Sequence, residues 1–337
     1  MKILVIHTAF IGDIVLSTPL LKRIKEVYPE AKITYVTTPI GATILRNNPN
    51  VTEIIEYDKR GNHSGIKGLL ALGRRLRYEN FNMVLTPHRY LRSSILAWLT
   101  RSPKRVGYDI ASGSCLFTDR INYDKSKHEV DKLLSFMGKV PENSREKYPI
   151  ELYPNKKDID VVDKIWNENN FNDQEIIAVA PGSKWFTKKW PLEYFNEVID
   201  LLVENGKKVI VIGGKDELYL NVNIQQDVLD LRGKTTLLEL AEVLKRVKVV
   251  LTNDSSPIHI ASAFKKTSIL AIFGPTVKEF GFFPWSENSE VLEIENLSCR
   301  PCAIHGGDKC PKGHFKCMLD IKPKQVYEKI LQILKRV

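Results

Sequence analysis

Long apolar stretches are missing from the sequence. No run reaches the roughly 18 to 20 residues that a membrane-spanning helix requires. The most hydrophobic stretch, from Ile3 to Leu21, is interrupted by His7, Gly12 and Asp13. We therefore interpret it as a strand followed by a helix, and not as a signal peptide. On this basis we expect the chain to work in the cytoplasm.

Cysteine is scarce and unevenly placed. One of the five cysteines is Cys115, and the other four fall between residues 299 and 317, which is unlike the even disulfide framework of a small secreted domain. The four clustered cysteines and two histidines near them are Cys299, Cys302, Cys310, Cys317, His305 and His314. The second cysteine pair lacks the tight spacing of a zinc knuckle, which favours reduced thiols. Structural zinc remains an open alternative, and the spacing assigns no metal ligand.

Two common phosphate-binding motifs are also absent. The pattern G-x-G-x-x-G occurs at none of the expected strand-to-helix junctions, which disfavours an enzyme that uses nicotinamide or flavin. The segment Gly233-Lys234-Thr235 resembles the end of a Walker A loop, but Val228 occupies the position of its first glycine. The sequence predicts no bound cofactor.

Acidic residues are almost missing from one part of the chain. Between Lys59 and Arg105 there are eleven lysines and arginines and a single acid, Glu79, so this window carries a net charge of +10, equal to that of the whole chain. Such an excess favours an anionic partner, although a dispersed, solvated surface is the alternative. No nucleic-acid recognition motif accompanies the charge, so nucleic acid is not predicted.

The remaining sequence is that of an ordinary globular protein, with 43% hydrophobic and 27% charged residues. Its 337 residues exceed what a single core normally supports. Short apolar strands alternate with amphipathic helices in both halves, which is typical of α/β proteins with parallel, doubly wound sheets. We expect strands over 3–6, 33–37, 53–57, 83–86, 176–180, 208–212, 249–252 and 268–273, and helices over 14–27, 41–46, 65–78, 192–204, 239–245, 257–264 and 323–336.

A polar, proline-punctuated stretch over 141–157 suggests a domain boundary near residue 155. We therefore predict one Rossmann-like domain over 1–155, a second over 156–320, and a closing helical segment over 321–337.

Polar and small residues follow several of the predicted strands. In open parallel sheets, ligands bind beyond the carboxyl ends of the strands, so these loops are candidate sites. Asp13 follows the first strand, where it is either a helix cap or a chemical group. Three loops of the second half, 181–191, 253–259 and 274–276, combine small residues, hydroxyls and lysines with prolines that suit helix starts. Together they can hold a diphosphate.

These segments, in this order, resemble glycosyltransferase family 9, the ADP-heptose:lipopolysaccharide heptosyltransferases. The resemblance covers nearly the whole chain. It rests on Lys2 to Ile6, Gly12-Asp13, Ser17-Thr18-Pro19, Pro181-Gly182-Ser183, Trp190-Pro191, Asn253-Asp254-Ser255, Pro257, His259 and Phe273-Gly274-Pro275-Thr276. Ser256 departs from the family, whose members commonly have glycine at that position.

The resemblance implies a GT-B fold, in which two Rossmann-like domains face a cleft. The acceptor would lie on the first domain, the nucleotide sugar on the second, and the last helix would return to pack on the first. It further implies single-step inverting transfer of a heptose to the lipopolysaccharide inner core, independent of a metal. Such a reaction needs a base for the attacking hydroxyl and electrostatic help for the departing diphosphate.

The family's roles transfer to particular positions of this chain. Asp13 matches the base, and Lys188 matches the lysine that binds the diphosphate, with Ser183 and Thr187 beside it. Asp216 is a weaker candidate for the ribose. The remaining donor-binding candidates are Asp254, Ser255, Ser256, His259, Gly274, Pro275 and Thr276.

The acceptor implied by the resemblance is an anionic lipid A inner core at the inner face of the membrane. We therefore expect Gly12 and the basic window, in particular Arg74, Arg75 and Arg77, to bind the acceptor and to hold the enzyme peripherally on the inner membrane. A sugar-nucleotide epimerase of similar form and a phosphate-binding protein without catalysis are the alternatives.

Overall fold

The computed structural model describes residues 1–59, 61, 63–172 and 174–336. The chain divides into two compact units, Met1–Tyr153 and Pro154–Val337. This division falls within two residues of the boundary predicted near residue 155.

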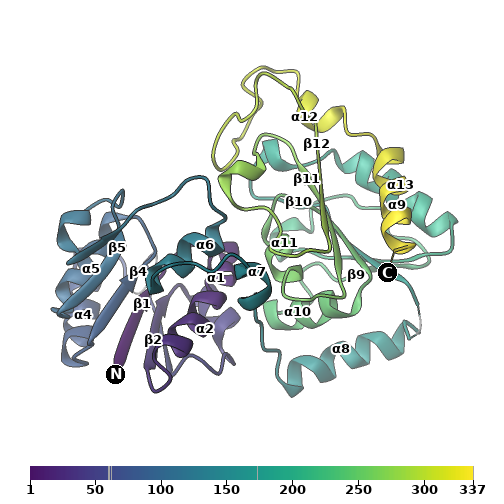
Figure 1. Ribbon diagram of the computed structural model, residues 1–337. Coiled ribbons are helices and arrows are strands. Elements are labelled where there is room, and N and C mark those ends of the chain that lie inside the picture. The colour runs from purple at the N-terminus through teal and green to yellow at the C-terminus, as the bar shows by residue number, and fades with distance from the viewer. Residues whose placement is uncertain (60, 62, 173, 337) are drawn as a thin grey trace. The chain divides into compact units, whose positions relative to one another are not determined.

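The first unit is a parallel sheet flanked by helices (Figure 1). Its strand order is β3-β2-β1-β4-β5-β6, and every neighbouring pair is parallel. The strands are β1 (Lys2–Ile6), β2 (Lys32–Thr37), β3 (Glu53–Glu56), β4 (Met83–Thr86), β5 (Lys104–Tyr108) and β6 (Asp119–Ile121). The α-helices are α1 (Ile11–Leu16), α2 (Thr18–Val27), α3 (Pro39–Leu45), α4 (Gly65–Tyr78), α5 (Leu91–Leu99), α6 (Glu129–Leu134) and α7 (Ser144–Lys147).

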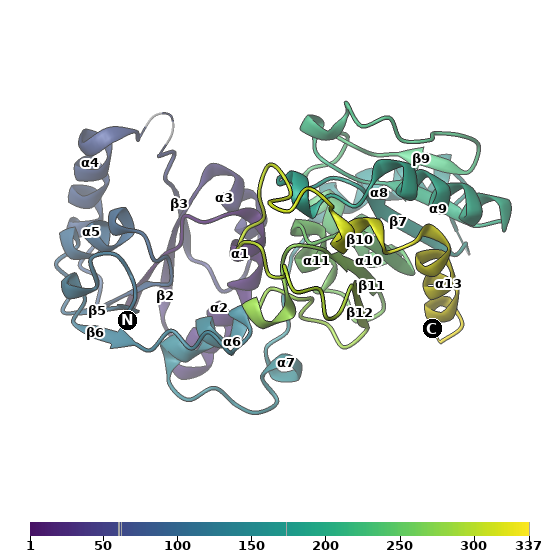
Figure 2. The ribbon, with the colours of Figure 1, turned by 90° about the horizontal axis from the view of Figure 1, so that it is seen from above.

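The second unit repeats this plan with the strand order β12-β11-β10-β7-β8-β9 (Figure 2). The strands are β7 (Ile176–Ala180), β8 (Lys208–Val211), β9 (Val228–Asp230), β10 (Val249–Asn253), β11 (Ser268–Phe273) and β12 (Ser289–Glu293). The α-helices are α8 (Lys156–Glu168), α9 (Leu192–Glu204), α10 (Leu237–Arg246), α11 (Ser256–Ala261), α12 (Lys316–Leu319) and α13 (Pro323–Leu334). The predicted α/β class with two Rossmann-like sheets is confirmed.

Local sequence explains where several helices begin and end. The single helix predicted over 14–27 is divided at Ser17, because Pro19 stands in the first turn of α2, where its missing amide is tolerated. Asn155 and Asp158 form a capping box that starts α8, and Thr236 and Glu239 do the same for α10.

Both sheets reverse their winding direction between two central strands. In the first unit this switch lies between β1 and β4, and in the second it lies between β7 and β10. A doubly wound sheet opens a crevice for ligands at this point, beyond the carboxyl ends of the two strands. The topology therefore singles out the loops that follow these four strands.

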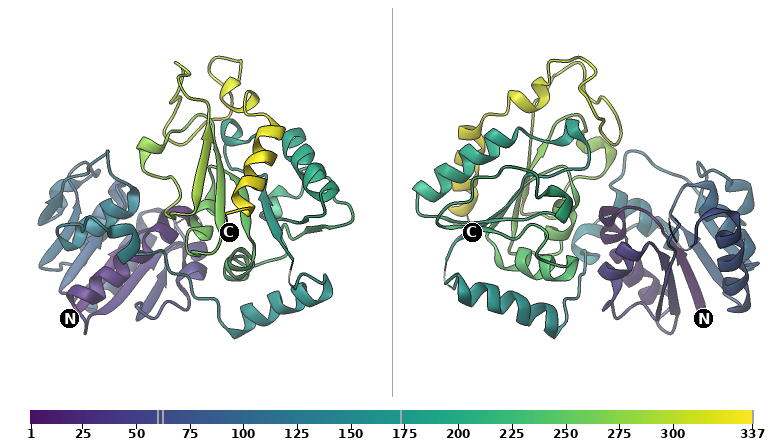
Figure 3. Two further views of the ribbon diagram at one scale, coloured as in Figure 1. Left: turned by 45° about the vertical axis from the view of Figure 1, so that its right-hand side comes forward. Right: turned by 180° about the vertical axis from the view of Figure 1, so that it is seen from behind.

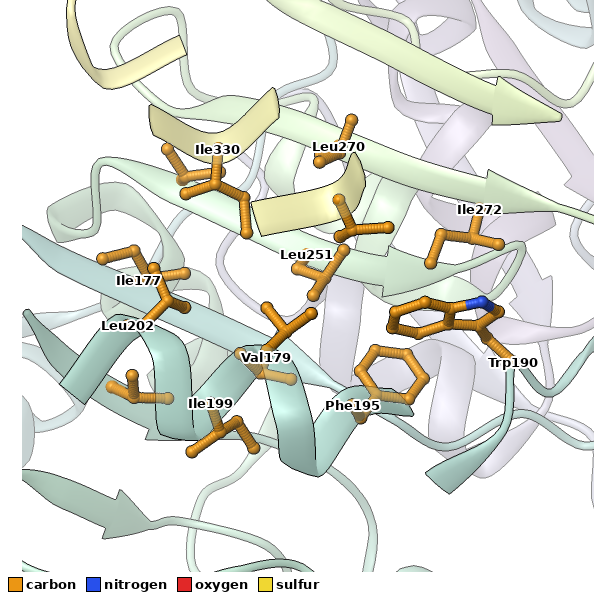
Figure 4. Close-up of a cluster of buried hydrophobic side chains, with 14 of the residues drawn as sticks. Ile177, Val179, Trp190, Phe195, Ile199, Leu202, Leu251, Leu270, Ile272 and Ile330 are labelled. Carbon is orange, nitrogen blue, oxygen red and sulfur yellow. The ribbon is translucent and has the colours of Figure 1, made fainter. Parts of the chain in front are cut away.

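The last helix contributes to the core of the second unit. The buried side chains of Val326, Ile330 and Ile333 belong to the core of the second unit. Helix α13 packs beside α9 and against β10 (Figure 3), and Trp190 and Phe195 belong to the same cluster (Figure 4). The apolar face of this helix is therefore buried within the second unit, and its packing on the first domain stays a prediction.

None of the described helices is both long enough and apolar enough to span a membrane.

Candidate functional site

Asp13 lies in the first turn of α1, the helix that follows β1 in the chain. Its carboxylate Oδ2 accepts a hydrogen bond from the Phe10 amide at 3.2 Å, as the third residue of a capped helix can. Burial raises the pKa of Asp13 to about 7, with a further contribution from the nearby Glu129 carboxylate. The Phe10 amide and the Arg89 guanidinium oppose this rise without cancelling it. Asp13 therefore caps the helix and has the pKa of a general base suited to neutral pH.

Neutral, mutually hydrogen-bonded side chains surround this loop. The Tyr35 hydroxyl lies 2.7 Å from Ser17 Oγ and 3.3 Å from His7 Nδ1. His88 follows β4, and its Nδ1 lies 2.7 Å from Ser93 Oγ. Burial, reinforced by neighbouring positive charges, lowers the pKa of both histidines to about 3. Both imidazoles are therefore uncharged at neutral pH and line the loop as polar groups of fixed orientation.

Three basic residues of the predicted window lie at this same carboxyl edge of the first sheet. Lys59 follows β3 and donates from Nζ to the Thr8 carbonyl at 2.7 Å. Arg89 follows β4 and lies over the Tyr123 ring, with its guanidinium carbon 4.6 Å from the ring centroid. Arg92 in α5 lies 5.8 Å from the Tyr57 ring centroid. Positive charge therefore accompanies the Asp13 loop.

The three arginines predicted for the acceptor lie elsewhere. Arg74, Arg75 and Arg77 occupy the end of α4, which leads to the start of β4. Arg75 pairs with Glu53, the first residue of β3, at 2.9 Å. Because a crossover helix runs antiparallel to its strands, its last turn lies at the amino edge of the sheet. The structure therefore does not bring these arginines to Asp13, whereas Gly12 adjoins it in α1.

In the second unit, an ion pair joins two of the loops at the sheet's carboxyl edge. Lys188 Nζ lies 2.6 Å from Asp254 Oδ2, and both side chains are largely buried. Thr276 donates its hydroxyl to the same oxygen at 2.6 Å. Asn253 ties the loops further, because its amide nitrogen donates to the Pro181 carbonyl at 2.8 Å and its oxygen accepts from the Trp190 amide at 2.9 Å. Three predicted donor-binding residues, from three loops, are thus in direct contact.

His259 adds an unsatisfied polar atom to this group. Burial lowers the pKa of His259 to about 4, with Asp254 and Lys188 acting in opposite directions. The ring is therefore neutral, and among the described residues its Nδ1 has no hydrogen-bond partner. A buried polar atom of this kind is costly unless a ligand or water satisfies it.

The other predicted donor residues of the second unit, apart from Asp216, lie on the same three loops. Thr187 belongs to a short 3-10 helix, Phe186–Lys188, and Ser183 lies buried in the loop that precedes it. Ser255 is the residue before α11, and Ser256 is its first residue. Gly274 and Pro275 directly follow β11 and are buried.

The predicted ribose residue is exposed, whereas its neighbour is directed inward. Asp216 and Glu217 belong to a 3-10 helix, Lys215–Glu217, after β8. The Glu217 carboxylate lies so close to Gly182 and Gly213 that a β-carbon on either would collide with it, and it accepts from the Gly214 amide at 3.2 Å. Burial raises the pKa of Glu217. Sequence reasoning missed Glu217, since only its packing against the glycines separates it from Asp216.

The comparison with known families decides the assignment. The profile of glycosyltransferase family 9 (heptosyltransferase) matches residues 69–309, more than half of the chain. The chain belongs to glycosyltransferase family 9. This heptosyltransferase-family chain is 28% identical to lipooligosaccharide heptosyltransferase 2 of Campylobacter jejuni subsp. jejuni serotype O:2, and the alignment covers 99% of both chains.

Solved structures agree on the fold of this family 9 member. The family 9 glycosyltransferase of Veillonella parvula DSM 2008 superposes with a TM-score of 0.84 at 23% identity, over 100% of this chain and 98% of the other. The ADP-heptose LPS heptosyltransferase II of E. coli gives a TM-score of 0.79 at 21% identity, over 100% and 99%. A UDP-N-acetylglucosamine 2-epimerase structure from Listeria monocytogenes gives a TM-score of 0.55 at 10% identity, over 99% of this chain and 88% of the other. The fold is therefore shared with epimerases, and the family match supports glycosyl transfer.

Proposed function

We propose that this glycosyltransferase moves a heptose from ADP-heptose to the inner core of lipopolysaccharide with inversion at the anomeric carbon. The acceptor hydroxyl attacks that carbon, the bond to the ADP oxygen breaks, and the hydroxyl proton passes to a base. The observation that carries the proposal is Asp13, a carboxylate at the switch point of the first sheet with a pKa of about 7. A base of this pKa combines a large ionised fraction at neutral pH with useful proton affinity.

The second unit supplies the groups for the departing ADP. Lys188, which pairs with Asp254 in this structure, offers a positive charge to the diphosphate. The free Nδ1 of His259 offers a further polar contact to the donor. Glu217 is held against the glycines at the ends of β7 and β8, and we assign it the ribose hydroxyls in place of Asp216. Charge stabilisation by these protein groups makes the transfer step independent of a catalytic metal.

Electrostatic attraction holds the acceptor in this proposal. Arg89 and Lys59 lie near Asp13 at the carboxyl edge of the first sheet, so we assign them, with Gly12, to the anionic inner core. The exposed Arg74 and Arg77 then serve a different purpose, which is attraction of the enzyme to the anionic inner face of the membrane. Each basic residue near such a surface contributes about 1 kcal/mol. We accordingly propose a peripheral, inner-membrane-associated enzyme.

The deciding experiment follows ADP release from ADP-heptose in magnesium-free buffer, with and without a lipid A inner-core acceptor. We expect ADP release to require the acceptor, and the product's anomeric configuration, measured by NMR, to be opposite to that of the donor. Acceptor-independent conversion of the donor would support an epimerase-like activity instead. Donor binding without turnover under either condition would support a binding protein.

A further inference from the structure

The segment between β12 and α12 has little to hold it in place by packing. Residues 294–315 contain no helix or strand, and most of their side chains are exposed or half-buried. In Figure 1 this yellow-green segment runs as a long loop before α12. Loops of this length inside a compact domain are uncommon unless they serve a function, and short segments without a core are often held by disulfides or metals.

Four thiols gather within this segment and at its end. The cysteines are all unbridged, and Cys317 is close enough to interact electrostatically with Cys299, Cys302 and Cys310. Cys302 interacts with Cys299 and Cys310 in the same way, and its thiol donates to the Cys299 carbonyl at 3.0 Å. Cys115 lies in the first unit, outside this group. The four cysteines distributed over residues 299–317 thus form one cluster, which we call the thiol cluster.

Hydrogen-bond donors are already directed at two of these sulfurs. The Gly313 amide, in the tight turn after Cys310 with φ +71°, donates to the Cys310 carbonyl at 3.1 Å, and the backbone amides of this turn lower the pKa of the Cys310 thiol. His314 Nε2 lies 3.7 Å from Cys299 Sγ, and its Nδ1 accepts from the Lys316 amide at 3.0 Å. Since Nδ1 is an acceptor, the neutral ring carries its proton on Nε2 and donates to the sulfur. Such N–H···S contacts stabilise thiolates and surround metal-bound sulfurs.

The same segment is connected to two of the three donor loops, 181–191 and 274–276. Thr187 and Gly307 form reciprocal hydrogen bonds, from the Thr187 amide at 3.0 Å and from the Gly307 amide to Thr187 Oγ1 at 2.8 Å. The Cys302 amide donates to the Pro275 carbonyl at 3.0 Å, and Arg300 donates to the Thr276 carbonyl at 2.8 Å. The position of the thiol cluster is therefore linked to that of the donor loops.

We propose that Cys299, Cys302, Cys310 and Cys317 bind one tetrahedral transition-metal ion, zinc or iron, which fixes this segment against the donor loops. Four thiolates in a tetrahedron are the ligand set that such ions prefer, and binding releases the thiol protons. In the described part of the chain no three metal-binding side chains already stand in coordinating geometry. Binding therefore requires the cysteine side chains to change rotamer, and the staggered wells about each Cα–Cβ bond allow such a change. The ion is structural, so the transfer chemistry remains independent of it.

Metal content tests the site without reference to activity. The full-length chain, carrying a tag without histidine and purified under reducing conditions, is analysed by mass spectrometry of its elements. We expect about one zinc or iron per chain, falling at least fivefold in Cys302→Ser and in Cys310→Ser and unchanged in Cys115→Ser. Wild-type protein that holds less than about a tenth of an ion per chain, even after incubation with Zn²⁺ or Fe²⁺, would overturn the proposal. Equal metal content in all four proteins would overturn it too.

A second measurement does not depend on how the variants fold. The wild-type protein is stripped with a chelator and refilled with Co²⁺, and we expect the intense absorption of tetrahedral cobalt bound to thiolates. A weak octahedral spectrum would contradict the site.

The link to the donor loops rests on the proposed function. It predicts at least about tenfold weaker ADP binding by the stripped protein, restored on refilling. Equal ADP affinity of both forms would refute the link alone, and absence of ADP binding even when metal is bound would count against the proposed function.

Discussion

Replacing Asp13 by asparagine is expected to change stability and activity in opposite directions. Because burial raises the pKa of this carboxyl from 3.8 to about 7, the folded protein binds the proton more tightly than the unfolded chain. Stability is therefore lost as the pH rises from about 4 to about 7, and the full cost is present above pH 7. Asparagine has nearly the same shape, accepts the Phe10 amide equally well and carries no charge.

The size of the effect follows from the same pKa. A tenfold change in a protonation equilibrium is worth about 1.36 kcal/mol, so the rise from 3.8 to about 7 corresponds to an upper limit of about 4 kcal/mol at pH 8. The Asp13 side chain is partly exposed, and its hydration recovers part of this cost. We expect Asp13→Asn to gain about 2 kcal/mol at pH 8, or roughly 4 to 8 °C in Tm for a domain of this size. Transfer should fall at least about a hundredfold, as for other general bases.

The assay is thermal unfolding of both proteins between pH 4 and pH 8, followed by circular dichroism, beside kcat for transfer. The Tm advantage of Asp13→Asn should shrink towards zero near pH 4, and wild-type kcat should fall as the pH drops below about 7. If Asp13 is instead an ionised carboxylate that only stabilises the helix N-terminus, loss of its charge predicts the reverse at pH 8, namely a loss of roughly 0.3 to 1 kcal/mol with normal turnover. That result would refute the reasoning.

Three further substitutions test the donor and acceptor groups. Lys188→Ala removes a charge from the diphosphate site and should weaken ADP binding about tenfold in calorimetry, with Lys184→Ala as the control on the same loop. Glu217→Gln should weaken ADP binding about tenfold by the same method, whereas the exposed Asp216→Asn should leave it within about twofold. Arg89→Gln should raise the acceptor KM several-fold with an unchanged donor KM. Because this guanidinium lowers the pKa of the base, it should also move the acidic limb of the rate profile to higher pH.

A matched control for Arg89 comes from the other end of the basic window. The triple substitution of Arg74, Arg75 and Arg77 by glutamine should leave both KM values unchanged. It should, however, reduce binding to vesicles rich in anionic lipid at least about tenfold, an effect that salt should mimic. A selective rise in acceptor KM for the triple variant would return these arginines to the acceptor site.

For the donor site, equal ADP affinity of the Lys188→Ala and Lys184→Ala proteins would remove Lys188 from the diphosphate site.

Local patterns predict elements well where they are strongly periodic. The strands over 176–180 and 268–273 and the helices over 65–78 and 192–204 were predicted with the bounds that the structure has. Helix α5 and strand β5 were missed, as was β12, whose residues Ser289 to Glu293 are all half-buried. A strand at the edge of a sheet has few buried neighbours, so its sequence lacks the apolar run that marks a central strand.

The sequence by itself determined the parallel α/β class, and it marked Asp13, Lys188 and Asp254 as residues that come after predicted strands. These depend on hydrophobic period and on residues that follow strands, which are local properties. Only the tertiary structure decided which groups meet: that Lys188 pairs with Asp254, that Glu217 turns inward, and that α13 packs in the second unit. It also decided that the end of α4 lies at the amino edge of its sheet, away from Asp13. The charge pattern along the sequence does not show at which edge of the sheet a basic residue lies, because that depends on the direction in which each crossover helix returns.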